Sequence, residues 1–123
     1  MAAPTVLVVE DDPTILQLLE VNFEMEGFTV VAAVDGADGL QRATEVKPDV
    51  IVSDVMMPNM SGIEMVAALR AQEETKGIPI VLLSAKAQGG DVRDGLAAGA
   101  DDYVTKPFEL LDLIDRVNAL LAR

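Results

Sequence analysis

The sequence lacks cysteine, histidine and tryptophan, and has only three phenylalanines and one tyrosine among its 123 residues. Without cysteine, disulfides, thiol chemistry and thiolate metal sites are excluded. Without histidine, the chain has no His-dependent catalytic triad, no His metal ligand and no phosphohistidine of its own. Basic residues are also scarce, since nine Lys and Arg face 21 Asp and Glu, for a net charge of −12. We therefore expect no direct nucleic-acid binding, which depends on Lys and Arg neutralising phosphates.

Long hydrophobic runs are missing as well. No apolar run reaches the roughly 20 residues that cross a bilayer, and residues 1–4 show no basic segment followed by an apolar stretch. We expect a cytoplasmic protein with no membrane partner. Half of the residues are hydrophobic, which is enough to form a core without disulfide or metal cross-links. The length fits one domain over residues 1–123.

Short apolar, β-branched runs alternate with helix-like segments along the chain. This alternation predicts an α/β fold, a doubly wound (βα)5 sandwich around a parallel sheet. The strand order that we expect is 2-1-3-4-5, as in flavodoxin-like folds. The expected strands are residues 5–9, 28–33, 50–53, 78–83 and 102–105, and the expected helices are 13–26, 37–46, 63–72, 91–98 and 109–121.

Local signals refine three of these helices. Asp12 before Pro13 is a typical N-cap followed by a first-turn proline. In the third helix, the spacing predicts that Ile63, Val66 and Ala67 face inward. Gly89-Gly90 is interpreted as a loop, followed by a marginal helix over 91–98, and both are candidate moving parts.

Five polar side chains occur where strands are expected to end. The first strand is followed by Glu10 and Asp11, the third by Asp54, the fourth by Ser84 and the fifth by Lys106. In an open α/β sheet, ligands bind beyond the carboxyl ends of the strands. These five side chains are therefore expected to converge on one pocket.

The residue types predict the chemistry of that pocket. Carboxylates at close range repel one another, and a hard divalent cation such as Mg²⁺ relieves this repulsion with oxygen ligands. Lys106 is suited to pair with a carboxylate or a phosphoryl oxygen, and Ser84 supplies a hydroxyl donor. A carboxylate nucleophile, Asp54, beside a metal ion and a lysine forms a phosphoryl-acceptor site.

Four motifs in this order resemble the receiver domain of bacterial two-component response regulators, which includes the chemotaxis regulators. The resemblance covers nearly the whole chain, from Thr5 to the last helix, and is strongest to receivers of winged-helix transcription regulators. The motifs are Val8-Val9-Glu10-Asp11-Asp12, Ser53-Asp54 with Met57-Pro58, Leu83-Ser84-Ala85, and Tyr103-Val104-Thr105-Lys106-Pro107-Phe108.

The resemblance implies a role for each site residue. Asp54 accepts a phosphoryl group from the phosphohistidine of a sensor histidine kinase or a histidine phosphotransfer protein. Mg²⁺, or Mn²⁺ in its place, is held by Glu10 or Asp11, by Asp54 and by the backbone carbonyl of Met56. The Lys106–Pro107 bond is implied to be cis, which aims the lysine into the pocket.

Two further groups follow from the resemblance. Ser84 and Tyr103 are implied to be a switch pair that reports phosphorylation to the face of the fourth helix, fifth strand and fifth helix. Asp101, Asp102 and Arg116 resemble residues through which such receivers form homodimers on phosphorylation. The implied function is a phosphorelay switch that is not an enzyme and only slowly removes its own phosphoryl group.

Two other functions stay open on the sequence. A metal-dependent phosphohydrolase would also use Asp54 as nucleophile, but such enzymes commonly have a second acid two residues later, where this chain has Met56. A flavodoxin-like cofactor binder shares the fold, but Glu10 and Asp11 stand where its phosphate loop would carry glycine and hydroxyl residues. The cognate kinase, the signal and the output partner are not encoded in readable motifs.

Overall fold

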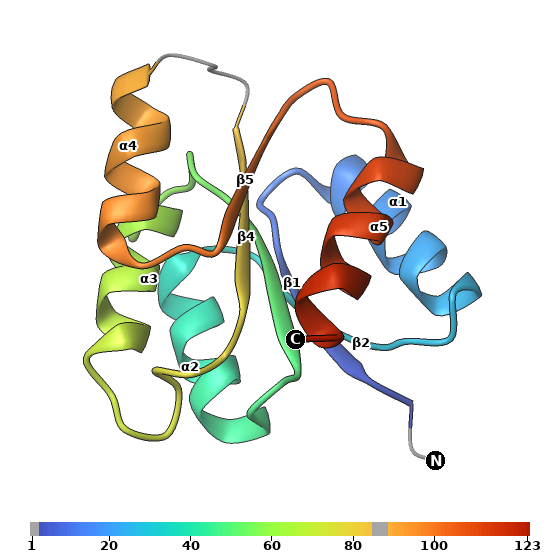
Figure 1. Cartoon of the computed structure of the whole chain (residues 1–123), viewed down its shortest axis with the longest axis horizontal. Helices are drawn as coiled ribbons and strands as arrows, with labels where there is room; N and C mark the ends of the chain where they lie inside the picture. Colours follow the sequence, from blue (N-terminus) through green and yellow to red (C-terminus); the bar gives the residue numbers. More distant parts are fainter. Residues whose placement is uncertain (1–2, 85–88) are drawn as a thin grey trace.

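The computed structural model of the chain describes residues 3–84 and 89–123, and in this part strands and helices alternate throughout (Figure 1). Each strand is followed by one helix, as the hydrophobic pattern predicts. The elements are β1 (Thr5–Val9), α1 (Pro13–Met25), β2 (Thr29–Ala33), α2 (Gly36–Val46), β3 (Val50–Asp54), α3 (Gly62–Arg70), β4 (Ile80–Ser84), α4 (Gly89–Ala98), β5 (Asp102–Thr105) and α5 (Leu110–Leu121).

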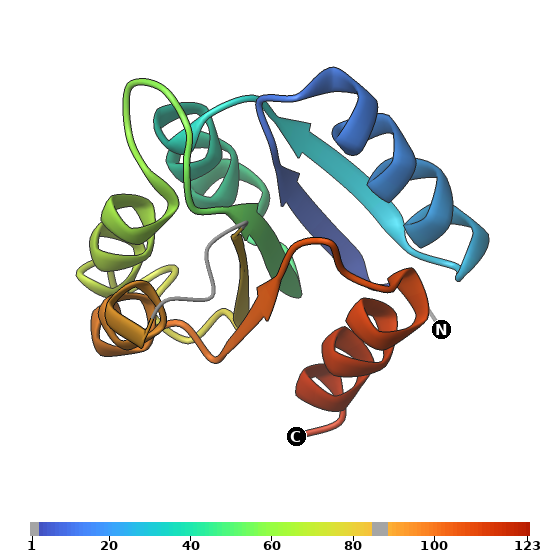
Figure 2. The same cartoon turned by 90° about the horizontal axis from the view of Figure 1, so that it is seen from above.

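The five strands form one parallel sheet in the order β2-β1-β3-β4-β5, which confirms the predicted fold class. Helices α1 and α5 cover one face of this sheet, and α2, α3 and α4 cover the other (Figure 2). Successive residues of a strand point to opposite faces, so each strand contributes to two separate cores. In β1, Val6 and Val8 pack with α1 and α5, whereas Leu7 and Val9 pack with α2 and α3.

Several helix boundaries differ from the sequence prediction because caps act locally. The Asp35 carboxylate accepts the N–H of Asp38 at 2.8 Å, so α2 begins at Gly36 and not at residue 37. A reciprocal capping box between Ser61 and Glu64 starts α3 at Gly62, one residue earlier than predicted.

The strand and loop predictions also need corrections. β4 begins at Ile80 and not at residue 78, because Ile78 donates its N–H to a turn carbonyl at Thr75 and Pro79 has no N–H to give to the ladder. The predicted Gly89-Gly90 loop is wrong, since both residues lie in the first turn of α4.

In α3, the predicted inward position of Ala67 is wrong, and Met65 and Leu69 are buried in its place. The predicted cap of α1 is confirmed, because the Asp12 carboxylate accepts the N–H groups of Thr14 and Ile15.

Among the described residues, none of the helices combines the length and the apolar character needed to span a bilayer.

Candidate phosphoryl-acceptor site

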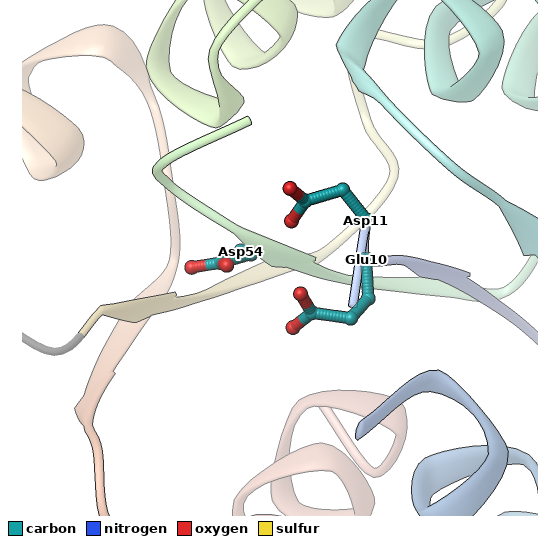
Figure 3. Close-up of side chains that lie close together, drawn as sticks. All are labelled: Glu10, Asp11 and Asp54. Carbon is teal, nitrogen blue, oxygen red and sulfur yellow. The ribbon is translucent and has the colours of Figure 1, made fainter. Parts of the chain in front are cut away.

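Three carboxylates lie together at the carboxyl ends of β1 and β3 (Figure 3). Glu10, Asp11 and Asp54 each offer an oxygen, and these oxygens all lie within 4.8 Å of one another. Glu10 is 1% exposed and Asp54 is 7% exposed, whereas Asp11 is open to solvent. The structure therefore brings together the three acids that the sequence predicts.

Strand periodicity explains why Glu10 and Asp54 share one side of the sheet. Each is separated by an even number of residues from side chains that pack under α1 and α5, namely Val8 in β1 and Val52 in β3. Because β1 and β3 are neighbours in register, their ends are level at this edge. Two strands thus deliver their acids to the same point.

Lys106 reaches this point from the end of β5. Its Nζ lies 3.2 Å from Glu10 Oε1 and 3.1 Å from Asp54 Oδ2, within hydrogen-bond distance of both carboxylates. The Lys106–Pro107 peptide bond is cis, as the resemblance implies. One ammonium group therefore links acids that are 44 residues apart in the chain.

Burial and charge perturb the proton affinities of these groups. Burial is the main reason that the pKa of Glu10 rises from 4.5 to about 7, and the Asp54 charge adds to the rise. Burial alone would lower the pKa of Lys106, but its hydrogen bonds and charge interactions with Asp54 and Glu10 raise it above the ordinary 10.5. The cluster raises the pKa of Glu10 although the Lys106 ammonium group already lies beside it. Such a cluster is suited to bind a second cation.

Ser84 and Tyr103 lie on the other side of the sheet from Lys106. Ser84 ends β4 and is 1% exposed, and Tyr103 pairs with Leu82, two residues before Ser84. The Tyr103 ring packs against α4, where a Cβ added to Gly95 would lie 3.3 Å from it. The two predicted switch residues thus share the face of the sheet that α4 covers.

Met56 follows Asp54 in the loop before α3, and its side chain is 62% exposed. The assignment of its backbone carbonyl to the metal site stays a prediction. Ala85, the last residue of the third motif, lies outside the described residues.

Asp101, Asp102 and Arg116 lie away from the acid cluster and are paired within the chain. Asp101 Oδ2 accepts Arg70 Nη2 at 2.9 Å and the Ile80 N–H at 2.8 Å. Both oxygens of Asp102 bind Arg116 Nη1, at 2.9 and 3.0 Å. The sequence carried no signal for the role of Arg70, because its partners are mostly backbone carbonyls.

An apolar groove adjoins the site on the α1 and α5 side, with a volume of about 540 Å³. Lys106 therefore contacts both the acid cluster and this groove. The lining residues are Ile15, Leu18, Lys106, Pro107, Phe108 and Leu110.

Comparison with known proteins agrees with this geometry. The family model of the response regulator receiver domain matches residues 6–118. The chain belongs to this family. It is therefore a signalling domain of the two-component phosphorelay type, and nothing in the comparisons supports the phosphohydrolase alternative.

Curated relatives are transcriptional regulators. This receiver domain is 48% identical over 123 residues to the transcriptional regulatory protein PrrA of Mycobacterium tuberculosis, and 42% identical over 120 residues to the phosphate regulon regulator PhoB of Rhizobium meliloti. These matches cover 100% and 98% of the chain but only 52% and 53% of the relatives. The chain thus spans about half the length of the relatives that it matches.

Solved structures show the same fold. The receiver domain of the Francisella response regulator 1452 superposes with a TM-score of 0.91 at 41% identity, with 98% of each chain covered. The receiver domain of sensor histidine kinase PA1611 from Pseudomonas aeruginosa superposes with a TM-score of 0.92 at 30% identity, over 99% of this chain and 100% of that one. That structure contains a magnesium ion coordinated in its active-site cleft.

Proposed function

We propose that Asp54 is the phosphoryl acceptor of this receiver domain. One observation carries the proposal: Lys106 Nζ bridges Asp54 and Glu10, so a cation already compensates the carboxylate that must approach a phosphoryl group. Asp54 is 7% exposed, which leaves the nucleophile reachable while its neighbours hold it in place. Lys106 and Ser84 are the groups that we assign to contact the bound phosphoryl oxygens.

The proposed step is a phosphoryl transfer between two side chains. A carboxylate oxygen of Asp54 attacks the phosphorus of a phosphohistidine on a partner protein. The new P–O bond forms as the P–N bond breaks, and the imidazole leaves with the electron pair and takes up a proton from solvent. Lys106 pairs with the charge that gathers on the phosphoryl oxygens.

The donor set fits a hard divalent cation. Glu10, Asp11 and Asp54 supply carboxylate oxygens, and we add the backbone carbonyl of Met56 as a further ligand. Mg²⁺, or Mn²⁺ in its place, would neutralise the charge that acid cluster and phosphoryl group bring together. The Glu10 side chain is suited to reach the ion directly or through a water.

The phosphodonor is proposed to dock on the apolar groove beside Lys106. The partner is a sensor histidine kinase or a histidine phosphotransfer protein, as for other two-component receivers. Leu18 and Val21 of α1 are each 47% exposed and extend this apolar surface away from the site. A helix seated there would bring its histidine to the Asp54 side of Lys106.

The signal is proposed to leave through the opposite side of the sheet. A phosphoryl group on Asp54 would draw in Ser84, and Tyr103 on the same face would follow by changing its packing against α4. Partner binding or homodimerisation on the α4, β5 and α5 face, near Asp102 and Arg116, is the proposed output. The domain itself is proposed to be a switch with only slow self-dephosphorylation, cytoplasmic and without nucleic-acid contact.

Incubation with Mg²⁺ and acetyl phosphate tests the acceptor. We expect a mass increase of about 80 Da, one phosphoryl group, that is absent from Asp54→Asn. The matched control is Asp49→Asn, an aspartate at the opposite end of the sheet, which should still take up the group. No adduct with several phosphodonors, or an adduct that persists in Asp54→Asn, would reject the proposal.

A further inference from the structure

The loop after β2 and the loop after β3 are in direct contact beside the site. Asn59 Nδ2 donates to Asp35 Oδ2 at 2.8 Å, and the N–H of Gly36 donates to the carbonyl of Met60 at 3.1 Å. A Cβ at Gly36 would overlap that carbonyl oxygen and lie 2.9 Å from the Met60 Cβ. Only glycine permits this approach, which joins two segments 24 residues apart.

The Asp35 carboxylate divides its two oxygens between two partners. Oδ1 accepts the N–H of Asp38 and caps α2, and Oδ2 accepts the side chain of Asn59. These two hydrogen bonds lower the pKa of Asp35 below its ordinary value, so the carboxylate is ionised and accepts both bonds at neutral pH. Asp35 is thus anchored to a helix end and holds the neighbouring loop from there.

The loop after β3 is closed at its base by backbone hydrogen bonds, and at its tip the N–H of Met60 donates to the Pro58 carbonyl at 2.7 Å. The N–H of Gly62 donates to the Val55 carbonyl at 2.9 Å, and the Val55 N–H donates to Leu83 at 2.9 Å. At the tip, Asn59 has φ of 68°, a left-handed conformation that few residues other than asparagine and glycine adopt readily. The contact with Asp35 is the side-chain anchor of this tip.

We propose that Asp35 and Asn59 form a latch that positions the loop after β3, and with it the Met56 carbonyl, for the metal ion. The inference rests on the phosphoacceptor function proposed above. A loop that must be ordered at each binding event weakens affinity, whereas a loop held in place binds its ligand without that cost. Asp35 and Asn59 are positioning residues, since they act through the loop and not on the reacting atoms.

The substitution Asn59→Asp breaks the latch with little change in shape. It sets two carboxylates against each other, and aspartate still tolerates the left-handed conformation. Adding Asp35→Asn restores a donor–acceptor pair and the original net charge, because the new amide donates to the new carboxylate and its oxygen still caps α2. The double variant is therefore a rescue and Asp35→Asn alone is its control.

Two measurements follow the latch without phosphoryl transfer. We expect Asn59→Asp to weaken Mg²⁺ affinity, measured by calorimetry, about 5-fold, and to speed amide hydrogen exchange of Gly36 and Gly62 in metal-free protein by a similar factor. The double variant should return both values to within about 2-fold of the wild type. Since the added negative charge alone would favour cation binding, weaker affinity cannot come from charge.

Asp49→Ala is the matched control for a merely structural loss. Asp49 Oδ2 accepts the Thr5 N–H at 2.7 Å at the other end of β1, so its loss should lower the thermal midpoint without altering Mg²⁺ affinity. Unchanged affinity and exchange in Asn59→Asp, or a double variant no better than the single one, would overturn the latch. Failure of the wild type to take up phosphoryl groups would reject the acceptor function alone, since neither latch measurement depends on it.

Discussion

Glu10 is a buried acid that the fold keeps beside a second acid and a lysine. Its side chain is 1% exposed, and its carboxyl group accepts the N–H of Asp12 at 3.2 Å as well as the Lys106 ammonium. These bonds favour the charged form, but burial outweighs them and raises the pKa to about 7. At neutral pH, the Glu10 carboxyl group is therefore near the midpoint of its titration. Its ionised form is the one that can bind a metal ion.

The raised pKa of Glu10 predicts a pH dependence of stability in metal-free protein. The folded state keeps the Glu10 proton up to about pH 7, whereas the unfolded state keeps it only up to about pH 4.5. The free energy of unfolding therefore falls as the pH rises from 4.5 to 7. Glu10→Gln removes this loss. As the pH rises through that window, its free energy of unfolding should increase relative to that of the wild type, by about 3 kcal/mol in total.

Urea denaturation at a series of pH values in EDTA measures this difference. A difference between Glu10→Gln and wild type that stays constant from pH 4.5 to 7 would contradict the assignment.

Met56 is predicted to set the lifetime of the phosphoryl group. Its exposed apolar side chain stands two residues beyond Asp54, and we expect it to shield the acyl phosphate from water. Met56→Asn or Met56→Glu should speed dephosphorylation several-fold, measured as loss of the phosphoprotein mass over time, while the distant Met25→Asn should not. An unchanged or slower rate would refute the prediction. Lys86, two residues beyond Ser84, lies outside the described residues.

At the scale of elements, Arg70 ties the start of β4 to the loop before β5. Its guanidinium donates to the carbonyls of Gly99 at 2.9 Å and Ile78 at 2.7 Å and pairs with Asp101 at 2.9 Å. The side chain is 20% exposed, so these bonds are partly shielded from water. The Asp101 carboxylate is thereby occupied by a structural contact within the chain.

Arg70→Ala should lower the free energy of unfolding by about 2 kcal/mol, because partly buried acceptors lose a charged donor. Arg42→Ala is the matched control, since its exposed pair with Asp38 at 3.4 Å should contribute less than about 0.5 kcal/mol. Chemical denaturation of both variants measures the comparison. Equal losses in the two variants would show that Arg70 does not act as a tie.

If the partner docks on the groove beside α1, a substitution there should slow phosphoryl transfer from a kinase but not from a small phosphodonor. Leu18→Asp should slow phosphoryl transfer from a histidine kinase that phosphorylates the wild type, by about 10-fold, because it places a charge on an apolar contact. Uptake from acetyl phosphate, which needs no docking, should not change. Leu96→Asp on α4 is matched in exposure, 46% against 47% for Leu18, and should leave both rates intact. Equal slowing with both donors would place the defect in the site.

At the scale of the whole molecule, the prediction concerns assembly on phosphorylation. We expect the phosphorylated domain to dimerise through the α4, β5 and α5 face. Arg116→Glu should prevent dimerisation, because the new carboxylate would repel Asp102 of the same chain and Asp102 of a second copy. Arg42→Glu on α2 changes the charge equally and should not interfere. Sedimentation velocity with and without acetyl phosphate measures the mass. A wild type that stays monomeric in both states would reject the prediction.

Local patterns were sufficient to predict the strands and the acids and lysine at their ends, whereas the strand order was expected from the likeness to flavodoxin-like folds. The β-branched runs located all five strands, and the acids and the lysine at their ends pointed to one pocket before any contact was known. Helix ends were predicted less well, because caps such as Asp35 and Ser61 act through single hydrogen bonds. Ala67 was misplaced because the buried face follows Gly62, Met65, Val66 and Leu69 at helical spacing, and Ala67 falls beside this stripe.

The sequence by itself determined which residues we expect to carry chemistry and in which element each one lies, because strand periodicity and strand-end chemistry are local properties. Only the tertiary structure decided which of them meet. It set Lys106 against both Glu10 and Asp54, put Ser84 and Tyr103 on the other face, and joined Asp35 to Asn59 across 24 residues. The reason is physical: register, burial and pKa arise from contacts between distant segments, and no local pattern encodes their distances.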